Sequence, residues 1–212
     1  MVTQKLQKYT RLHIRSTFPD KKPGAAGPGL DTNGLAECMY LWLLILFIMK
    51  TLLLVRHAKS SWDNPAVRDI NRPLNERGLH DAPRMGKLIR SLGIKPDLLV
   101  SSPAKRALTT AQFFAEVFDI PDASILRNPD VYEAHVSEIM RIISALPNDA
   151  QTVMLFGHNP TFTEVANRFT EDFIDNVPTC GVVHLVSTAP DWASFYEGNT
   201  RVKACYFPKE VL

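Results

Sequence analysis

Runs of apolar residues that stop abruptly at polar residues recur along the chain. The sharpest is Leu52 to Val55, which is followed at once by two cationic residues. Similar runs end at Val100 and at Phe156. A short apolar run bounded by polar residues is typical of a strand buried on both faces, as in a parallel sheet covered by helices. We therefore predict strands at 52–55, 97–100 and 152–156.

Between these runs, apolar residues recur at intervals of three and four, which is the period of an amphipathic helix. Asn75 is placed to cap one such segment, and Gly93 is placed to end it. Asn159 is placed to cap another, with Pro160 at the first helical position. We predict helices at 75–92, 103–118, 137–146 and 161–169.

The C-terminal part of the chain favours strands again. Residues 182–186 are mostly apolar, and residues 195–196 and 202–207 flank Gly198-Asn199, a pair typical of hairpin turns. Strands that alternate with helices and then follow one another predict a three-layer α/β/α sandwich, with a mostly parallel sheet and an antiparallel edge near the C-terminus.

The first 48 residues differ in composition from the rest. They carry six Lys or Arg residues against three acidic residues, which accounts for the net charge of +2, and residues 21–29 are rich in Pro and Gly. This composition predicts a disordered extension. The apolar run at 38–49 is shorter than the roughly 20 residues that span a bilayer. We expect one domain at 49–212 and either a native start at Met49 or an extension without function, with membrane contact by the apolar run as the alternative.

The composition narrows the classes of function. The chain is 45% apolar and 22% charged, which is typical of a globular protein. Residues 49–212 carry no basic excess, so a nucleic-acid partner is not expected. The three cysteines are far apart and show no Cys-x-x-Cys spacing, which indicates neither a disulfide framework nor a zinc site. We expect a reducing, cytoplasmic location.

Polar side chains follow each of the three predicted parallel strands. Arg56 and His57 follow the first, Ser101, Ser102 and Arg106 follow the second, and His158 and Asn159 follow the third. Because parallel strands end at one edge of a sheet, these groups can converge. Two arginines, two histidines and helix N-termini favour binding of a tetrahedral oxyanion. No carboxylate cluster or metal-ligand spacing accompanies the histidines, so no metal is expected. The alternative is a set of strands that simply end in surface residues.

Three motifs carry a resemblance to a known family. They are Leu-Val-Arg-His-Ala-Lys-Ser-Ser-Trp at 54–62, Ser-Ser-Pro-Ala-Lys-Arg-Ala at 101–107 and Gly-His-Asn-Pro at 157–160. Together they resemble the histidine phosphatase superfamily, most closely its SixA-type phosphohistidine phosphatases, over about residues 51–207. The resemblance implies the phosphoglycerate mutase-like fold and no cofactor. It also implies His57 as the phosphoryl-accepting nucleophile, Arg56 and Arg106 as the groups that hold the phosphoryl oxygens, and His158 as the fourth member of the pocket.

The match is weaker at two positions. Ala58 stands where the superfamily usually has Gly, as SixA-type members accept. Glu133 is the candidate by position for the acid that protonates the leaving group, but an ordinary loop residue is the alternative, since the usual Gly-rich sequence does not follow it. Imidazole leaves readily, so a phosphohistidine substrate tolerates a weak acid. Ser60 could add a hydrogen-bond donor to the phosphate.

We therefore expect a metal-independent, cytoplasmic phosphatase that acts through a phosphohistidine on His57. The expected substrate is a phosphorylated protein, such as a histidine-containing phosphotransfer domain, because few residues are left to build a lid over a small substrate. A phosphomonoesterase or mutase acting on a small phosphorylated molecule is the first alternative. A non-catalytic phosphate-binding module is the second.

Overall fold

The computed structural model describes residues 49–212. The predicted extension at 1–48 and almost all of the apolar run at 38–49 lie outside the described residues. Within the described part, no helix is long and apolar enough to cross a membrane.

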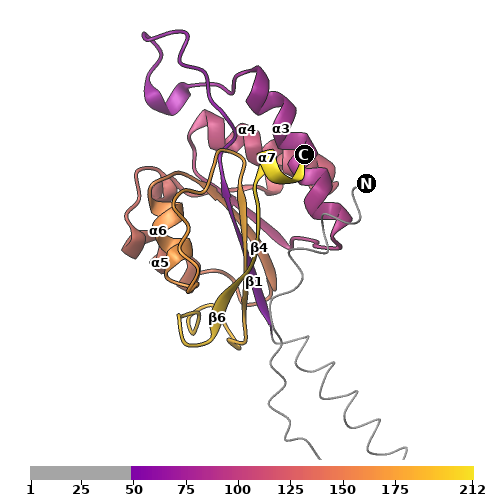
Figure 1. Cartoon of the computed structure of the whole chain (residues 1–212), viewed down its shortest axis with the longest axis vertical. Helices are drawn as coiled ribbons and strands as arrows, with labels where there is room; N and C mark the ends of the chain where they lie inside the picture. The colour runs from indigo at the N-terminus through magenta and orange to yellow at the C-terminus, as the bar shows by residue number, and fades with distance from the viewer. Residues whose placement is uncertain (1–48) are drawn as a thin grey trace, which may run out of the picture. The chain divides into compact units, whose positions relative to one another are not determined.

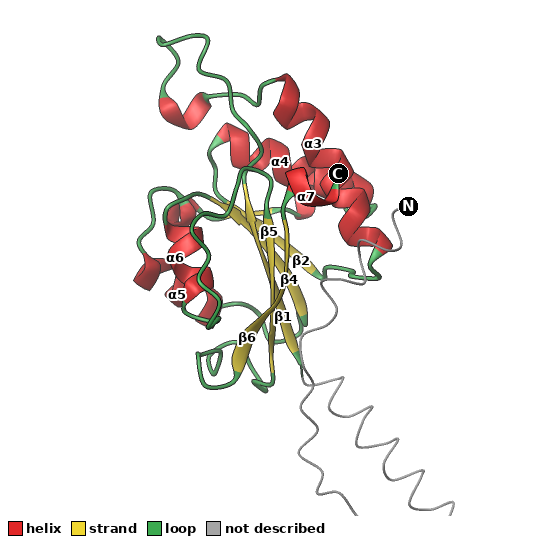
Figure 2. Cartoon of the chain, in the orientation of Figure 1, coloured by secondary structure: helices red, strands yellow, loops and turns green. Residues whose placement is uncertain are grey.

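The described residues form one six-stranded mixed sheet (Figure 2). Four neighbouring strands run parallel, β5 pairs antiparallel with β1, and β6 pairs antiparallel with β5 at one edge. This is the mostly parallel sheet with an antiparallel edge that the sequence predicts. In the order in which they lie across the sheet, the strands are β3 (Leu126–Arg127), β2 (Leu98–Ser101), β4 (Thr152–Gly157), β1 (Lys50–Arg56), β5 (Val182–Ser187) and β6 (Thr200–Tyr206).

Helices cover both faces of the sheet, which confirms the three-layer sandwich (Figure 1). One layer contains α3 (Glu76–Ser91), α4 (Lys105–Val117) and the short α7 (Pro208–Val211), and the other contains α5 (Val136–Ser144) and α6 (Thr161–Asn167). Single 3-10 turns lie at Asp69–Asn71 (η1), Asp122–Ser124 (η2) and Pro129–Val131 (η3).

The apolar run of β1 fills both layers of the core. Leu52 and Leu54 belong to the cluster packed under α5 and α6, whereas Leu53 and Val55 belong to the cluster packed under α3 and α4. All four side chains are fully buried. Side chains alternate between the faces of a strand, so a strand covered on both sides needs apolar residues at every position.

The expected limits of α3 are confirmed. The Asn75 side chain accepts a hydrogen bond from the backbone N–H of Gly78, and Gly93 follows the helix with φ +76°. A positive φ suits Gly at the end of a helix because Gly has no Cβ to clash with the backbone.

Two local predictions are wrong. Residues 195–196 form no strand. We predicted that they pair with 202–207 in a hairpin, but β6 pairs with β5 instead. Asn159 does not cap α6, since its side-chain amide donates to Thr163 Oγ1 and to the loop that carries Asn176 and Val177.

Candidate active site

The three strands that end in polar residues are adjacent in the sheet. β4 lies between β2 and β1, and all three are parallel, so their carboxyl ends lie at one edge. Backbone hydrogen bonds continue past the strand ends, from His57 N to Gly157 O at 3.0 Å and from Ser102 N to Phe156 O at 3.0 Å. The predicted convergence of these segments is therefore present.

His57 lies half-buried at the end of β1 with its two ring nitrogens in different environments. Nδ1 is 2.7 Å from the carbonyl oxygen of Ala58, so Nδ1 carries the proton and donates. Nε2 is then unprotonated and accepts a hydrogen bond from Arg106 Nε at 3.3 Å. Burial, together with the charges of nearby arginines, lowers the pKa of His57 to about 4, against the opposing effect of the Ala58 carbonyl. His57 therefore presents a neutral, unprotonated nitrogen whose lone pair is directed at Arg106.

His158 faces His57 from the end of β4, with the two ring centroids 5.2 Å apart. Its Nε2 is 2.8 Å from the hydroxyl oxygen of Ser102, and its Nδ1 has no hydrogen-bond partner within the described residues. The ring also meets Tyr132 edge-on, at 5.8 Å between centroids. Burial first, and then the neighbouring His57 and Arg106, lower the pKa of His158 to about 3, so this imidazole is neutral too.

Both predicted arginines lie at the site, but they are held in different ways. Arg106, in the first turn of α4, is buried, and its terminal nitrogens donate to the backbone oxygen of Asp69 at 2.7 Å and to its carboxylate at 2.9 Å. Arg56 donates from Nη1 to Val177 O at 2.7 Å and to Asn176 Oδ1 at 3.2 Å. Its Nε is buried with no partner among the described residues. Free N–H groups therefore remain available to an anion.

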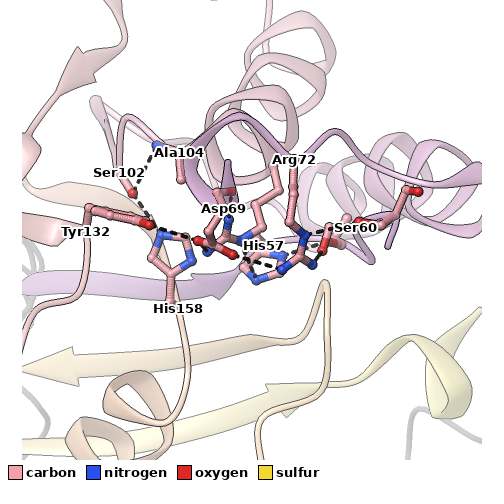
Figure 3. Close-up of polar contacts among 11 residues, drawn as sticks. His57, Ser60, Asp69, Arg72, Ser102, Ala104, Tyr132 and His158 are labelled. Carbon is pink, nitrogen blue, oxygen red and sulfur yellow. Dashed lines mark hydrogen bonds and ion pairs between the residues drawn. The ribbon is translucent and has the colours of Figure 1, made fainter. Parts of the chain in front are cut away.

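A carboxylate at the centre of the site was not predicted. Asp69, in η1, accepts from Arg106 Nη2 and from the Tyr132 hydroxyl through Oδ2, and from Arg72 Nη1 through Oδ1, each at 2.9 Å. Figure 3 shows the Asp69 side chain between Tyr132 and His158 on one side and Arg72 on the other. The sequence signal was weak, because the loop at 58–75 has no periodicity; its length, directly after the predicted nucleophile, was the available clue.

Arg72 adds a third guanidinium, which is buried like that of Arg106. It donates to Asp69, to the Ser61 carbonyl and to the Ser60 hydroxyl, and it stacks on the exposed Trp62 ring at 3.2 Å from the centroid. Ser60 therefore lies in the cluster, with its hydroxyl oxygen accepting from Arg72, and its contact with the phosphate stays a prediction.

Glu133 lies next to Tyr132, at the edge of this cluster. It is exposed, and its φ of +57° is uncommon for a residue with a side chain. Burial, the hydrogen bond to Asp69 and the nearby Glu133 carboxylate raise the pKa of Tyr132 to about 12. The Tyr132 hydroxyl donates its hydrogen bond to Asp69. Arg72 and Arg106 donate to the same carboxylate, so Asp69 is the acidic residue in direct contact with these arginines.

Metal ligands of the usual kind do not gather here. Within residues 49–212, no group of three or more His, Cys, Asp or Glu side chains is arranged to hold a metal ion. The donors that converge on the site are guanidinium and imidazole groups, which suit an oxyanion.

Comparison with known proteins identifies the family. Residues 52–140 match the model of the histidine phosphatase superfamily (branch 1). An uncharacterized chloroplastic protein of Arabidopsis thaliana is 32% identical over 153 residues, which cover 68% of this chain and 70% of the relative. A structure assigned as the phosphohistidine phosphatase SixA of Agrobacterium tumefaciens is 29% identical, with a TM-score of 0.63 over 74% of this chain and 97% of that chain.

Mutases of the same superfamily also match, over a shorter length. A 2,3-bisphosphoglycerate-dependent phosphoglycerate mutase of Streptomyces avermitilis is 32% identical over 108 residues. This match covers 50% of this chain but only 41% of the mutase, so the chain spans about two fifths of that relative. The chain belongs to the histidine phosphatase superfamily, in its SixA-like branch, as an enzyme of the phosphatase and mutase class.

Proposed function

We propose that the protein removes a phosphoryl group from a protein phosphohistidine by way of a phosphohistidine on His57, within a catalytic domain at 49–212. The observation that carries the proposal is the direction of the His57 ring. Its Nδ1 is bound to the Ala58 carbonyl, and its Nε2 faces the guanidinium of Arg106. An unprotonated nitrogen aimed at cationic donors is arranged to attack phosphorus held by those donors.

In the first step, His57 Nε2 forms a bond to phosphorus while the bond between phosphorus and the substrate nitrogen breaks. Arg106 and Arg56 hold the equatorial oxygens, and His158 donates from Nδ1 while Ser102 donates to its Nε2. In the second step, water attacks phosphorus and the P–Nε2 bond breaks, which releases inorganic phosphate and restores His57. Glu133 remains the proposed donor to the leaving group, and Ser60 acts on the phosphate through Arg72.

The protonation states favour substrates with a P–N bond. Both imidazoles are neutral near pH 7, so neither is a strong acid there. An alkyl phosphate expels a basic alkoxide that needs a proton, whereas a phosphohistidine that is protonated on its second ring nitrogen expels a neutral imidazole, which needs no proton on the departing nitrogen. We therefore expect the enzyme to act without a metal or other cofactor on a histidine-containing phosphotransfer domain.

The test is to trap acid-labile phosphate on the enzyme and to map the modified residue. We expect the label on His57, no label on His57→Ala, and loss of turnover of a phosphorylated phosphotransfer domain in that variant. A His57→Ala variant that turns over substrate at the native rate contradicts the proposed mechanism. If the native chain binds phosphate but never becomes labelled or turns over substrate, the protein is a non-catalytic phosphate-binding module.

The matches to phosphoglycerate mutases make transfer between small molecules the second candidate. Incubation with 2- and 3-phosphoglycerate, with sugar phosphates and with the phosphorylated phosphotransfer domain compares the two functions directly. Interconversion of the phosphoglycerates, or higher kcat/KM on small phosphates than on the protein, contradicts the preferred substrate.

The compartment is proposed on separate grounds. Cysteine usage favours the cytoplasm, whereas the chloroplastic name of the Arabidopsis relative makes the plastid the alternative. Cell fractionation with detection of the native chain decides between them.

A further inference from the structure

The Asp69 side chain is held by three hydrogen bonds although it lies in a surface loop. Its side chain is 47% exposed, while those of Arg72 and Arg106 are only 9% exposed. Three strong donors converge on the carboxylate, and the neighbouring backbone oxygen binds Arg106 as well. The carboxylate is therefore fixed at the mouth of the site, with one side open to water.

The guanidinium of Arg106 connects this carboxylate to the nucleophile. Its Nε points to His57 Nε2, and both terminal nitrogens point to Asp69. Five N–H groups belong to the guanidinium, and three of them are used in these contacts. Phosphorylation of His57 Nε2 removes the acceptor of the Arg106 Nε contact, so this N–H and the two unused ones remain for the phosphoryl oxygens, and Arg106 can hold that group without releasing Asp69. Asp69 then lies beside the bound phosphoryl group, at the end of the Arg106 guanidinium that points away from His57.

The carboxylate also has room for one more hydrogen bond. An ionised carboxylate offers about four lone-pair sites. Oδ2 uses two, on Arg106 and Tyr132, and Oδ1 uses one, on Arg72. The fourth site, on Oδ1, can accept from a water molecule that arrives from solvent.

The second chemical step requires a proton acceptor. As water forms its bond to phosphorus, it must lose a proton, and the histidines are poorly suited to receive it because His57 is phosphorylated and His158 faces the phosphoryl oxygens. The arginines and the Tyr132 hydroxyl are donors in this site. Asp69 is the anionic group in direct contact with them. Burial raises the pKa of its carboxyl group, but the Tyr132 hydrogen bond and then the charge of Arg106 outweigh burial, so the pKa is lowered and the carboxylate stays ionised.

We propose that Asp69 is a catalytic residue that accepts the proton of the hydrolytic water when the phosphohistidine on His57 is broken down. This inference rests on the proposed function. The water oxygen forms a bond to phosphorus, the P–Nε2 bond breaks with its electron pair returning to His57, and one water proton moves to Oδ1 of Asp69. The products are inorganic phosphate and a protonated carboxylate, which passes its proton to solvent through its exposed side.

The test separates the two half-reactions in the full chain. Rapid mixing with 4-nitrophenyl phosphate reports phosphorylation of His57 as a burst of nitrophenol and hydrolysis as the later steady rate. For Asp69→Asn we expect a burst close to one equivalent, phosphorylation within a few-fold of the native rate, and hydrolysis slowed by about 100- to 10,000-fold, the usual contribution of a general base. Acid-labile phosphate should accumulate on His57.

Three variants serve as comparisons. Asp63→Asn removes a carboxylate of the same loop whose hydrogen bonds, among residues 49–212, go to Ser61, and both steps should keep their native rates. With an alkyl phosphate in place of 4-nitrophenyl phosphate, whose leaving group needs no proton, Glu133→Gln should slow the first step, in line with its proposed role, and not the second. Asp69→Ala should regain hydrolysis when formate, a small carboxylate, is added, whereas a merely structural role gives no such rescue.

The inference is overturned if Asp69→Asn hydrolyses the phosphoenzyme at the native rate. It is also overturned if phosphorylation and hydrolysis slow equally and formate restores neither, because Asp69 would then only position Arg106 and Arg72. Failure of the proposed function looks different, since the native chain itself would then carry no phosphate on His57.

Discussion

Gly78→Ala should damage both stability and catalysis, although alanine is the better helix former. Gly78 lies in the first turn of α3, and a Cβ there would press on the backbone of Lys59, with the carbonyl oxygen nearest, N at 3.0 Å and C at 3.1 Å. Backbone atoms cannot relieve such a clash by changing rotamer, as a side chain can. The same Lys59 carbonyl accepts the backbone N–H of Asn75 at 2.9 Å, so the added methyl group also strains the contact that joins α3 to the loop after His57.

The expected size follows from three opposing terms. Alanine in a helix gains about 0.5–1 kcal/mol over glycine. Overpacking costs about 1–3 kcal/mol, and weakening the Asn75–Lys59 hydrogen bond costs about 0.5–1.5 kcal/mol. The net loss is about 2 kcal/mol, which for a domain of this size lowers Tm by about 4–8 °C. A displacement of the catalytic loop by about 1 Å can also reduce kcat about 100-fold.

Thermal unfolding and steady-state turnover of 4-nitrophenyl phosphate measure the two effects. Gly86→Ala, on the same helix but away from the loop, is the matched control, because its Cβ would meet the Val117 side chain of α4 at 3.2 Å and backbone only at 3.6 Å. We expect that control to stay within about 1 kcal/mol and to keep its native kcat. A Gly78→Ala variant that is more stable than the native chain and equally active would refute the close approach of α3 to Lys59.

Three further predictions concern single side chains. Ser102→Ala removes the hydroxyl that orients His158, and kcat/KM should fall about tenfold, measured on the phosphorylated phosphotransfer domain. Asn176→Ala should lower kcat/KM only about threefold, because Arg56 keeps its shorter hydrogen bond to a backbone carbonyl. Burial lowers the pKa of His184 to about 4, so below about pH 6.5 the unfolded chain takes up a proton at this residue and the native chain does not. The native chain therefore loses about 2 kcal/mol of stability at His184 between about pH 7 and pH 5. His184→Leu should abolish this loss, as measured by urea unfolding at the two pH values.

The parallel part of the sheet could be predicted because burial on both faces leaves a strong signal. Uninterrupted apolar runs such as 52–55 have no other simple explanation in a chain of this composition. The predicted strand at 195–196 is wrong because an apolar residue can also be buried outside a strand. Phe195 is apolar because it anchors a loop, packing on Trp192 at 5.5 Å and on Phe169 at 5.4 Å between ring centroids, and a buried loop residue leaves the same local signal as a strand.

The site could be predicted where strand ends fix positions. His57 and His158 follow apolar strands directly, and Arg106 lies in the first turn of the helix after β2, so their convergence depends mainly on the order and direction of those strands. Asp69 and Tyr132 lie on loops, and the loop at 58–75 is held by its own contacts, such as the bridge between Ser60 and Leu74. Such contacts depend on three-dimensional structure that no periodicity records.

The carboxylate of Asp69, which the sequence did not identify, also changes the net charge of the predicted site. The sequence indicated two arginines and two histidines, with Glu133 as a candidate acid, whereas the structure gathers three guanidinium groups, the Asp69 carboxylate and two neutral imidazoles. With Asp69 ionised the sum is +2, which matches a phosphoryl dianion without a proton on either histidine. Protonating either histidine would add charge to a buried cationic cluster, and this cost keeps His57 in the form that can attack phosphorus. Asp69 thus lets Arg72 and Arg106 lie close together, and nucleophile and anion-binding groups can share one small site.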